Sequence, residues 1–244
     1  RRGAPVTRRP TFRRDPAMKR LLPALGLAPF ALYITLFLCA PTVIAVGSGF
    51  FGPDGFTLAN LSVLAAPHVL EAFGASVWVS ALTAIIGACV GAILCWAITA
   101  LPEQGILRKS VDAASSVLAQ FGGVMLAFAF IATVGIQGVI TVTLRERAGI
   151  DFFANGVWLY ELPGLILPYL YFQIPLMVIT FAPAFSALRP GWAEAVATLG
   201  GSHLSYWTRV GVPLLAPSFL GSLLLLFANA FSSYATAAAL MSQG

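Results

Sequence analysis

Charged side chains are scarce in this sequence: 9% of its 244 residues are Asp, Glu, Lys or Arg, whereas 59% are hydrophobic. A soluble domain ordinarily has about 25% charged residues, which supply its polar surface. The scarcity of charge therefore excludes a water-soluble globular protein. Five stretches have no charged residue at all, and each is longer than the roughly 20 residues that a helix needs to cross a bilayer; they are residues 21–53, 72–102, 113–144, 162–188 and 210–244.

These stretches predict membrane-spanning helices. Helices and closed barrels are the structures that can span a bilayer, and continuous apolar runs do not have the alternating pattern of a barrel strand. We therefore predict an all-α, polytopic transmembrane helical bundle. The five predicted spans are residues 21–46, 75–100, 115–143, 161–182 and 212–240.

Residues for binding ATP or zinc are also missing. A phosphate-binding P-loop needs glycine immediately before Lys-Ser or Lys-Thr. The Lys109–Ser110 pair follows Arg108 instead, so this chain is not expected to bind ATP in that way. The two histidines, His68 and His203, fall in loops on opposite sides of the membrane and cannot form a zinc site together.

Charged residues are absent from the depths of the predicted spans, which argues against ion-coupled transport, because ion-coupled transporters usually have intramembrane carboxylates or histidines. No acids, bases or nucleophiles converge as an enzyme would require. The three cysteines, Cys39, Cys89 and Cys95, all fall within spans, where we expect buried, inert thiols. We therefore predict no enzymatic activity, no metal and no cofactor bound by this chain.

The basic residues are concentrated at the N-terminus: eight of the fourteen lie in residues 1–20. Because cytoplasmic segments are enriched in Lys and Arg, we predict a cytoplasmic basic tail at 1–20, followed by a transmembrane domain at 21–244. The loops at 47–74 and 144–160 then fall outside, and those at 101–114 and 183–211 inside. The net charge of +5 is thus explained by membrane topology, and we predict no nucleic-acid partner.

The cytoplasmic loop at 188–213 has the pattern of two short helices. Pro190 suits the first turn of a helix, and Glu194 lies near that turn, where the helix dipole favours a carboxylate. Gly200 and Gly201 can end this helix in the left-handed conformation. Ser202 suits the N-cap of a second helix at 203–210, which we expect Pro213 to close.

This loop resembles the EAA motif, EAA-x3-G-x9-I-x-L-P, of permease subunits in binding-protein-dependent ABC importers. The matching residues of the loop are Glu194, Ala195, Val196, Gly200, Val210, Val212 and Pro213. Three of them depart from the motif, with valine at 196, 210 and 212 in place of alanine, isoleucine and leucine. The resemblance covers roughly residues 72–244 and implies the type I (MetI-like) architecture of these permeases.

The resemblance also implies the partners of the chain. The loop would form a coupling helix that docks on a separate ABC ATPase, of which two copies bind ATP and Mg. A second permease chain, identical or different, and an extracytoplasmic solute-binding protein would complete the importer in a bacterial inner membrane. The family usually has a further span after the fifth, so we expect the given sequence to end before the last helix.

Two other segments, 171–177 and 227–236, resemble the spermidine/putrescine-type branch of this family. That resemblance implies a small polar or charged organic solute, with a polyamine as one option. Polar residues within the spans are candidates for lining the translocation path, although hydrogen bonding between helices is an equal alternative. The candidates are Gln137, Gln173, Asn229, Ser233 and Tyr234, with Asn229 and Ser233 on one face of the fifth helix.

The leading hypothesis is thus a permease subunit that forms the solute path and is driven by a separate ATPase. One alternative is a self-sufficient secondary transporter of a small polar solute, and another is a membrane-embedded enzyme. The lack of intramembrane charge disfavours the former, and the lack of a catalytic cluster disfavours the latter.

Overall fold

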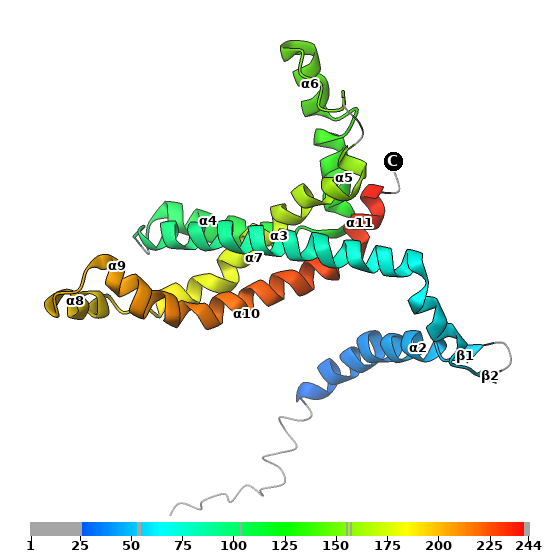
Figure 1. The fold of residues 1–244 in the computed structure, drawn as a ribbon, viewed down its shortest axis with the longest axis horizontal. Helices are drawn as coiled ribbons and strands as arrows, with labels where there is room; N and C mark the ends of the chain where they lie inside the picture. The colour runs from blue at the N-terminus through cyan, green and yellow to red at the C-terminus, as the bar shows by residue number, and fades with distance from the viewer. Residues whose placement is uncertain (1–25, 53–54, 103, 155, 157, 242–244) are drawn as a thin grey trace, which may run out of the picture. The chain divides into compact units, whose positions relative to one another are not determined.

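The computed structural model describes residues 26–52, 55–102, 104–154, 156 and 158–241 (Figure 1). The basic tail predicted at 1–20 lies outside the described residues. Contacts within the chain divide it into two units, Arg1–Leu70 and Glu71–Gly244, and each is described by itself.

The first unit contains one membrane-length helical stretch, Gly26–Ser48, which matches the predicted span at 21–46 over the described residues. The stretch includes a π-helical turn at Thr35–Cys39 and continues as α2 (Ala40–Ser48). The proline at position 41, in the first turn of α2, has no N–H to donate to the preceding turn, and the wider π turn accommodates this gap.

A short hairpin follows α2. Strands β1 (Phe51–Gly52) and β2 (Gly55–Phe56) pair antiparallel, with Phe51 opposite Phe56. A 3-10 helix, Ala59–Ala65, then leads to α3 (Pro67–Thr99), which begins at the end of the first unit and continues into the second.

The second unit is built around α7 (Ile166–Ser186), which packs against α4 (Ile106–Leu118) and α10 (Val212–Phe231). In Figure 1, α8 (Pro190–Thr198) and α9 (His203–Tyr206) lie at one end of this group of helices. The elements at the other end are α5 (Gly123–Val134), α6 (Val139–Ala148) and α11 (Tyr234–Met241), with 3-10 helices at Trp158–Tyr160 and Leu162–Leu165.

Small residues allow α3 and α7 to approach closely. A Cβ atom added to Gly91 would lie 2.5 Å from Cβ of Met177, and one added to Gly87 would lie 3.0 Å from Cβ of Gln173. A side chain at either position would press against α7, so the Gly87-x3-Gly91 spacing serves helix packing.

Two apolar clusters form the core of this unit. One lies between α3, α7 and α10 and includes Met177, Phe181 and Leu226. The other includes residues of α5, α7, α11 and the adjoining 3-10 helices, among them the buried Leu126 and Leu159. In a bilayer such cores are held by close packing rather than by exclusion of water, because lipid tails are as apolar as the side chains.

The structure confirms the all-α polytopic fold, with five helical stretches of membrane length and apolar composition. These are Gly26–Ser48, Pro67–Thr99, Gly123–Ala148, Leu162–Ser186 and His203–Phe231. The predicted bounds of the third span, 115–143, are wrong: residues 106–118 form the separate helix α4, a non-helical segment follows at 119–122, and a turn at 135–138 separates α5 from α6.

The predicted fifth span, 212–240, is also not one helix. A continuous helical stretch begins at His203, nine residues earlier than predicted, and ends at Phe231. A turn at Ser232 and Ser233 then redirects the chain into α11, which packs against α5. The break places α11 in the core of the unit, where Leu240 and Thr236 are fully buried.

Candidate functional site in the loop between α7 and α10

α8 begins as predicted, with Pro190 in its first turn and Arg189 as N-cap in an extended conformation. Extended backbone is favoured before proline, and the missing N–H of proline is harmless at the start of a helix. Glu194 is exposed, but it is the fifth residue of α8, and the first turn contains no acidic residue. Glu194 thus lies near the first turn, as predicted, but not within it.

The end of α8 is the double-bonded turn known as a Schellman motif. Gly200 has φ +77°, in the left-handed region that strongly favours glycine. The N–H of Gly201 donates to the carbonyl of Val196 at 2.8 Å, and the N–H of Gly200 donates to that of Ala197 at 3.0 Å. These two bonds satisfy carbonyls that the helix end would otherwise leave free, as the Gly-Gly pair predicted.

The second helix begins at His203 as predicted, but it continues past its predicted end at residue 210. The hydroxyl of Ser202 accepts a hydrogen bond from the N–H of Ser205 at 3.2 Å and caps α9. A π-helical turn at Trp207–Gly211 joins α9 directly to α10, so Pro213 lies inside a continuous helix instead of closing it. The wider turn accommodates the missing N–H of Pro213.

Four residues of the predicted motif line one groove, which we call the motif groove. It has a volume of about 590 Å³ and lies between α8 and the first half of the continuous helix His203–Phe231, which we call the long helix. Its lining residues are Trp192, Ala195, Val196, Arg209, Val210, Pro213 and Leu214. The other three motif residues serve elsewhere: Glu194 and Gly200 are exposed, and Val212 faces a second groove.

Two exposed leucines flank the turn between α8 and α9. Leu199 is 87% exposed and Leu204 is 72% exposed, so the turn presents an apolar surface. Of the two, Leu204 was not singled out from the sequence. Their position on either side of a Gly-Gly helix end was the available signal.

The candidate path residues do not form one surface. Gln173 is fully buried, and its Nε2 donates to Oγ1 of Thr83 on α3 at 2.9 Å. Gln137 is exposed in the turn between α5 and α6, and Tyr234 is 79% exposed at the start of α11.

Asn229 and Ser233 do not share a helix face, because α10 ends between them at Phe231. The hydroxyl of Ser233 donates to the carbonyl of Asn229 at 2.8 Å, and the hydroxyl of Tyr169 on α7 donates to the carbonyl of Ser233 at 3.1 Å. These bonds define the break between α10 and α11. Within the described part of the chain, no group of three His, Cys, Asp or Glu residues could hold a metal ion.

Comparisons with known proteins agree with this fold. No family model matches the sequence. The chain is 24% identical over 226 residues to the sulfate transport system permease protein CysT of Salmonella typhimurium, covering 88% of this chain and 74% of the relative. A probable sulfate permease of Marchantia polymorpha is 27% identical over 174 residues, covering 69% of this chain and 55% of that protein.

A third relative, the trehalose transport system permease protein SugB of Mycobacterium tuberculosis, is 24% identical over 157 residues, covering 64% of this chain and 50% of that protein. A crystal structure of a bacterial ABC transporter that imports the acidic polysaccharide alginate superimposes with a TM-score of 0.68 at 17% identity, covering 93% of this chain and 82% of that one. These relatives give no support to the spermidine/putrescine-type branch. They are transport permeases, which supports a non-enzymatic role.

Proposed function

We infer that this chain is the membrane-spanning permease subunit of an ATP-driven ABC importer. The carrying observation is the loop at 188–213, where residues with the spacing of the EAA motif form a groove and a capped helix end. The fold of the second unit and the sulfate and trehalose permeases among its relatives support the same function.

In this function the α8–α9 loop is the docking element for a separate ATPase. The exposed Glu194 offers a charge, and Leu199 and Leu204 offer an apolar contact. The motif groove can accept side chains of the ATPase between α8 and the long helix. Two ATPase copies supply the energy by binding and hydrolysing ATP with Mg, and this chain contributes no group to that chemistry.

The remaining parts of the importer follow from the same inference. The chain pairs with a second permease subunit, and a solute-binding protein delivers the solute from the outer side. The basic tail keeps the N-terminus on the cytoplasmic side of a bacterial inner membrane. The α8–α9 loop then lies on the same side, where ATP is available. A sulfate permease is similar to this chain over 88% of its length, so an inorganic oxyanion is the first solute class to test.

The test is uptake and ATP hydrolysis by the assembled complex in vesicles. We expect Glu194→Ala to lower solute uptake severalfold while insertion into the membrane is unchanged, because Glu194 is exposed and has no role in packing. Thr198→Ala is the matched control, since Thr198 is also exposed on α8. Full uptake by Glu194→Ala refutes the docking role.

Co-purification separates the importer from a secondary transporter. A permease subunit should be isolated from native membranes with an ATPase in fixed stoichiometry. Uptake by the isolated chain, driven by an ion gradient without ATP, would show that the chain is a secondary transporter.

A further inference from the structure

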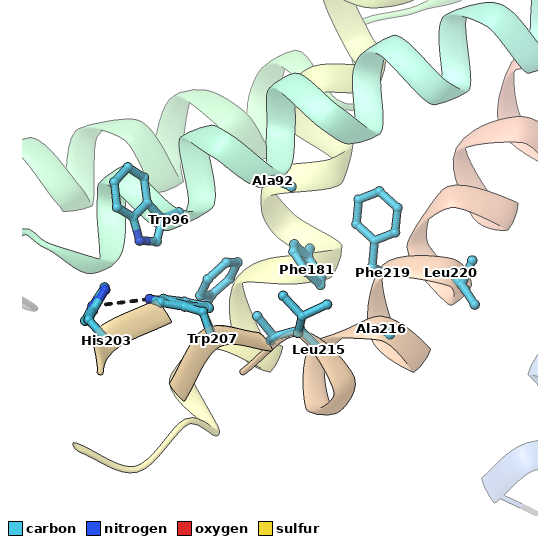
Figure 2. A pocket seen from close by; sticks show the side chains of 11 residues that line it. Ala92, Trp96, Phe181, His203, Trp207, Leu215, Ala216, Phe219 and Leu220 are labelled. Atoms are coloured by element: carbon cyan, nitrogen blue, oxygen red, sulfur yellow. Dashed lines mark hydrogen bonds between the residues drawn. The ribbon is translucent and has the colours of Figure 1, made fainter. Parts of the chain in front are cut away.

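A second groove lies between α3, α7 and the long helix that contains α9 and α10 (Figure 2). We call it the apolar groove; its volume is about 650 Å³. Its lining residues are Ala92, Trp96, Phe181, Phe185, His203, Trp207, Val212, Leu215, Ala216, Phe219 and Leu220.

The groove is open to the surroundings of the helices. Trp96 and Val212 are each 57% exposed, and Leu220 is 56% exposed. The lining residues belong to three stretches of membrane length, Pro67–Thr99, Leu162–Ser186 and His203–Phe231. The medium next to the groove is therefore the bilayer, and a lipid is the first molecule available to occupy the groove.

The length of the groove fits one leaflet. Its wall on α10 runs from Val212 to Leu220, which is about 12 Å at the rise of an α-helix. Half of the hydrocarbon thickness of a bilayer is about 15 Å. An acyl chain lying along the groove would thus extend from the membrane interface to near the midplane.

The two ends of the groove differ in chemistry. Figure 2 shows Trp96, His203 and Trp207 together at one end and Phe219 and Leu220 at the other. Nε1 of Trp207 donates to Nε2 of His203 at 3.3 Å, so the ring proton of His203 is on Nδ1. Among the described residues, no acceptor bonds to Nδ1 of His203 or to Nε1 of Trp96. These two N–H donors, which have no acceptor among the described residues, lie at one end of the groove, where they could bond the ester and phosphate oxygens of a lipid.

We propose that the apolar groove holds one phospholipid, with an acyl chain along Phe181, Leu215 and Phe219 and its oxygens at Trp96 and His203. A transmembrane helix fits these donors less well, because its backbone carbonyls are bonded within the helix. Since lipid tails gain little from leaving the bilayer, the hydrogen bonds and the close packing distinguish this lipid from its neighbours. Lipid retention in the groove does not depend on which solute is transported.

The test is retention of phospholipid by the full chain purified from vesicles of phosphatidylethanolamine and phosphatidylglycerol and washed with lipid-free detergent. We expect Trp96→Phe to lower retention about fivefold, the change for one lost hydrogen bond. Trp78→Phe is the matched control, because Trp78 is also on α3, is 59% exposed, and does not line the groove. Equal losses in both variants would overturn the proposal.

A second pair of variants tests the apolar part. Ala216→Phe fills the groove and should lower retention, whereas Ala228→Phe, at an exposed position of α10 outside the groove, should not. A photoreactive residue in place of Phe219 should then form adducts with lipid. Adducts mainly with a polypeptide, or equal retention in Ala216→Phe and Ala228→Phe, would show that the groove is an interface with another helix.

Discussion

The side-chain amide of Gln173 on α7 donates a 2.9 Å hydrogen bond to the hydroxyl of Thr83 on α3, and both residues are fully buried. The hydroxyl of Thr83 in turn donates to the carbonyl of Val79 at 2.8 Å. Oε1 of Gln173 has no partner among the described residues. The bond joins two helices that Gly87 and Gly91 already hold in close contact.

This relationship predicts that Thr83→Val destabilises the folded chain by about 1 kcal/mol, because the amide of Gln173 loses its acceptor in an apolar core. Gln173→Met should lower the stability less, because it removes the whole side-chain amide and leaves neither Nε2 nor Oε1 buried without a partner. The measurement is thermal unfolding in detergent for both single variants and the double variant. Additive losses in the double variant would contradict the coupling of these two side chains.

Gly200 predicts a second result. Gly200→Ala must hold φ near +77° with a Cβ atom, at a cost of about 1–2 kcal/mol. A cost of this size lowers the relative population of the native turn about five- to thirty-fold, so ATP-driven uptake should fall. Gly200→Asn should retain more uptake, because asparagine tolerates the left-handed region. Uptake that is equally low in both variants would point to the added side chain, not the backbone, as the cause.

Tyr169 predicts a third result, because its hydroxyl holds the break between α10 and α11 through the carbonyl of Ser233. Tyr169→Phe should weaken protection of the amides of α11 against hydrogen exchange by about 1 kcal/mol. Tyr171→Phe is the control: Tyr171 is also on α7, and among the described residues its ring contacts Phe121 and Phe130 while its hydroxyl has no partner. Unchanged exchange in Tyr169→Phe would mean that packing alone positions α11.

The proposed sidedness can be tested with single cysteines in a variant that lacks Cys39, Cys89 and Cys95. His68→Cys at the start of α3 and Thr198→Cys at the end of α8 place thiols at exposed positions on the two predicted sides of the membrane. In right-side-out vesicles, a membrane-impermeant maleimide should label position 68 at once and position 198 after permeabilisation. The reverse order would place the N-terminus outside.

The number of spans was predictable because a charged side chain is so unfavourable in lipid that a long uncharged stretch is itself strong evidence of a span. The breaks were not predictable in the same way. Residues 119–122 and Ser232–Ser233 are as free of charge as the helices around them. At Ser232–Ser233 the break is held by a tertiary partner, Tyr169, which charge composition does not reveal.

In the α8–α9 loop, too, some features were predictable from the sequence and others were not. The Gly-Gly pair and Ser202 predicted the end of α8 and the cap of α9, because these bonds are local in sequence. Pro213 misled the prediction, since a missing N–H usually ends a helix, and the π turn at Trp207–Gly211 removes that penalty. The motif groove forms because residues 209–214 lie next to α8, and the spacing of the motif residues in the sequence does not reveal this contact.

The uninterrupted helix from His203 to Phe231 has a mechanical consequence. Its 29 residues make a rod about 43 Å long, which works as a lever arm from the loop end to the break at Ser232. A tilt of about 5° about its loop end would swing the far end by roughly 4 Å, about two thirds of the 5.4 Å pitch of a helical turn. The π turn at Trp207–Gly211 lies near the loop end and is the natural pivot, so a small push on α8 and α9 would become a larger displacement at the far end.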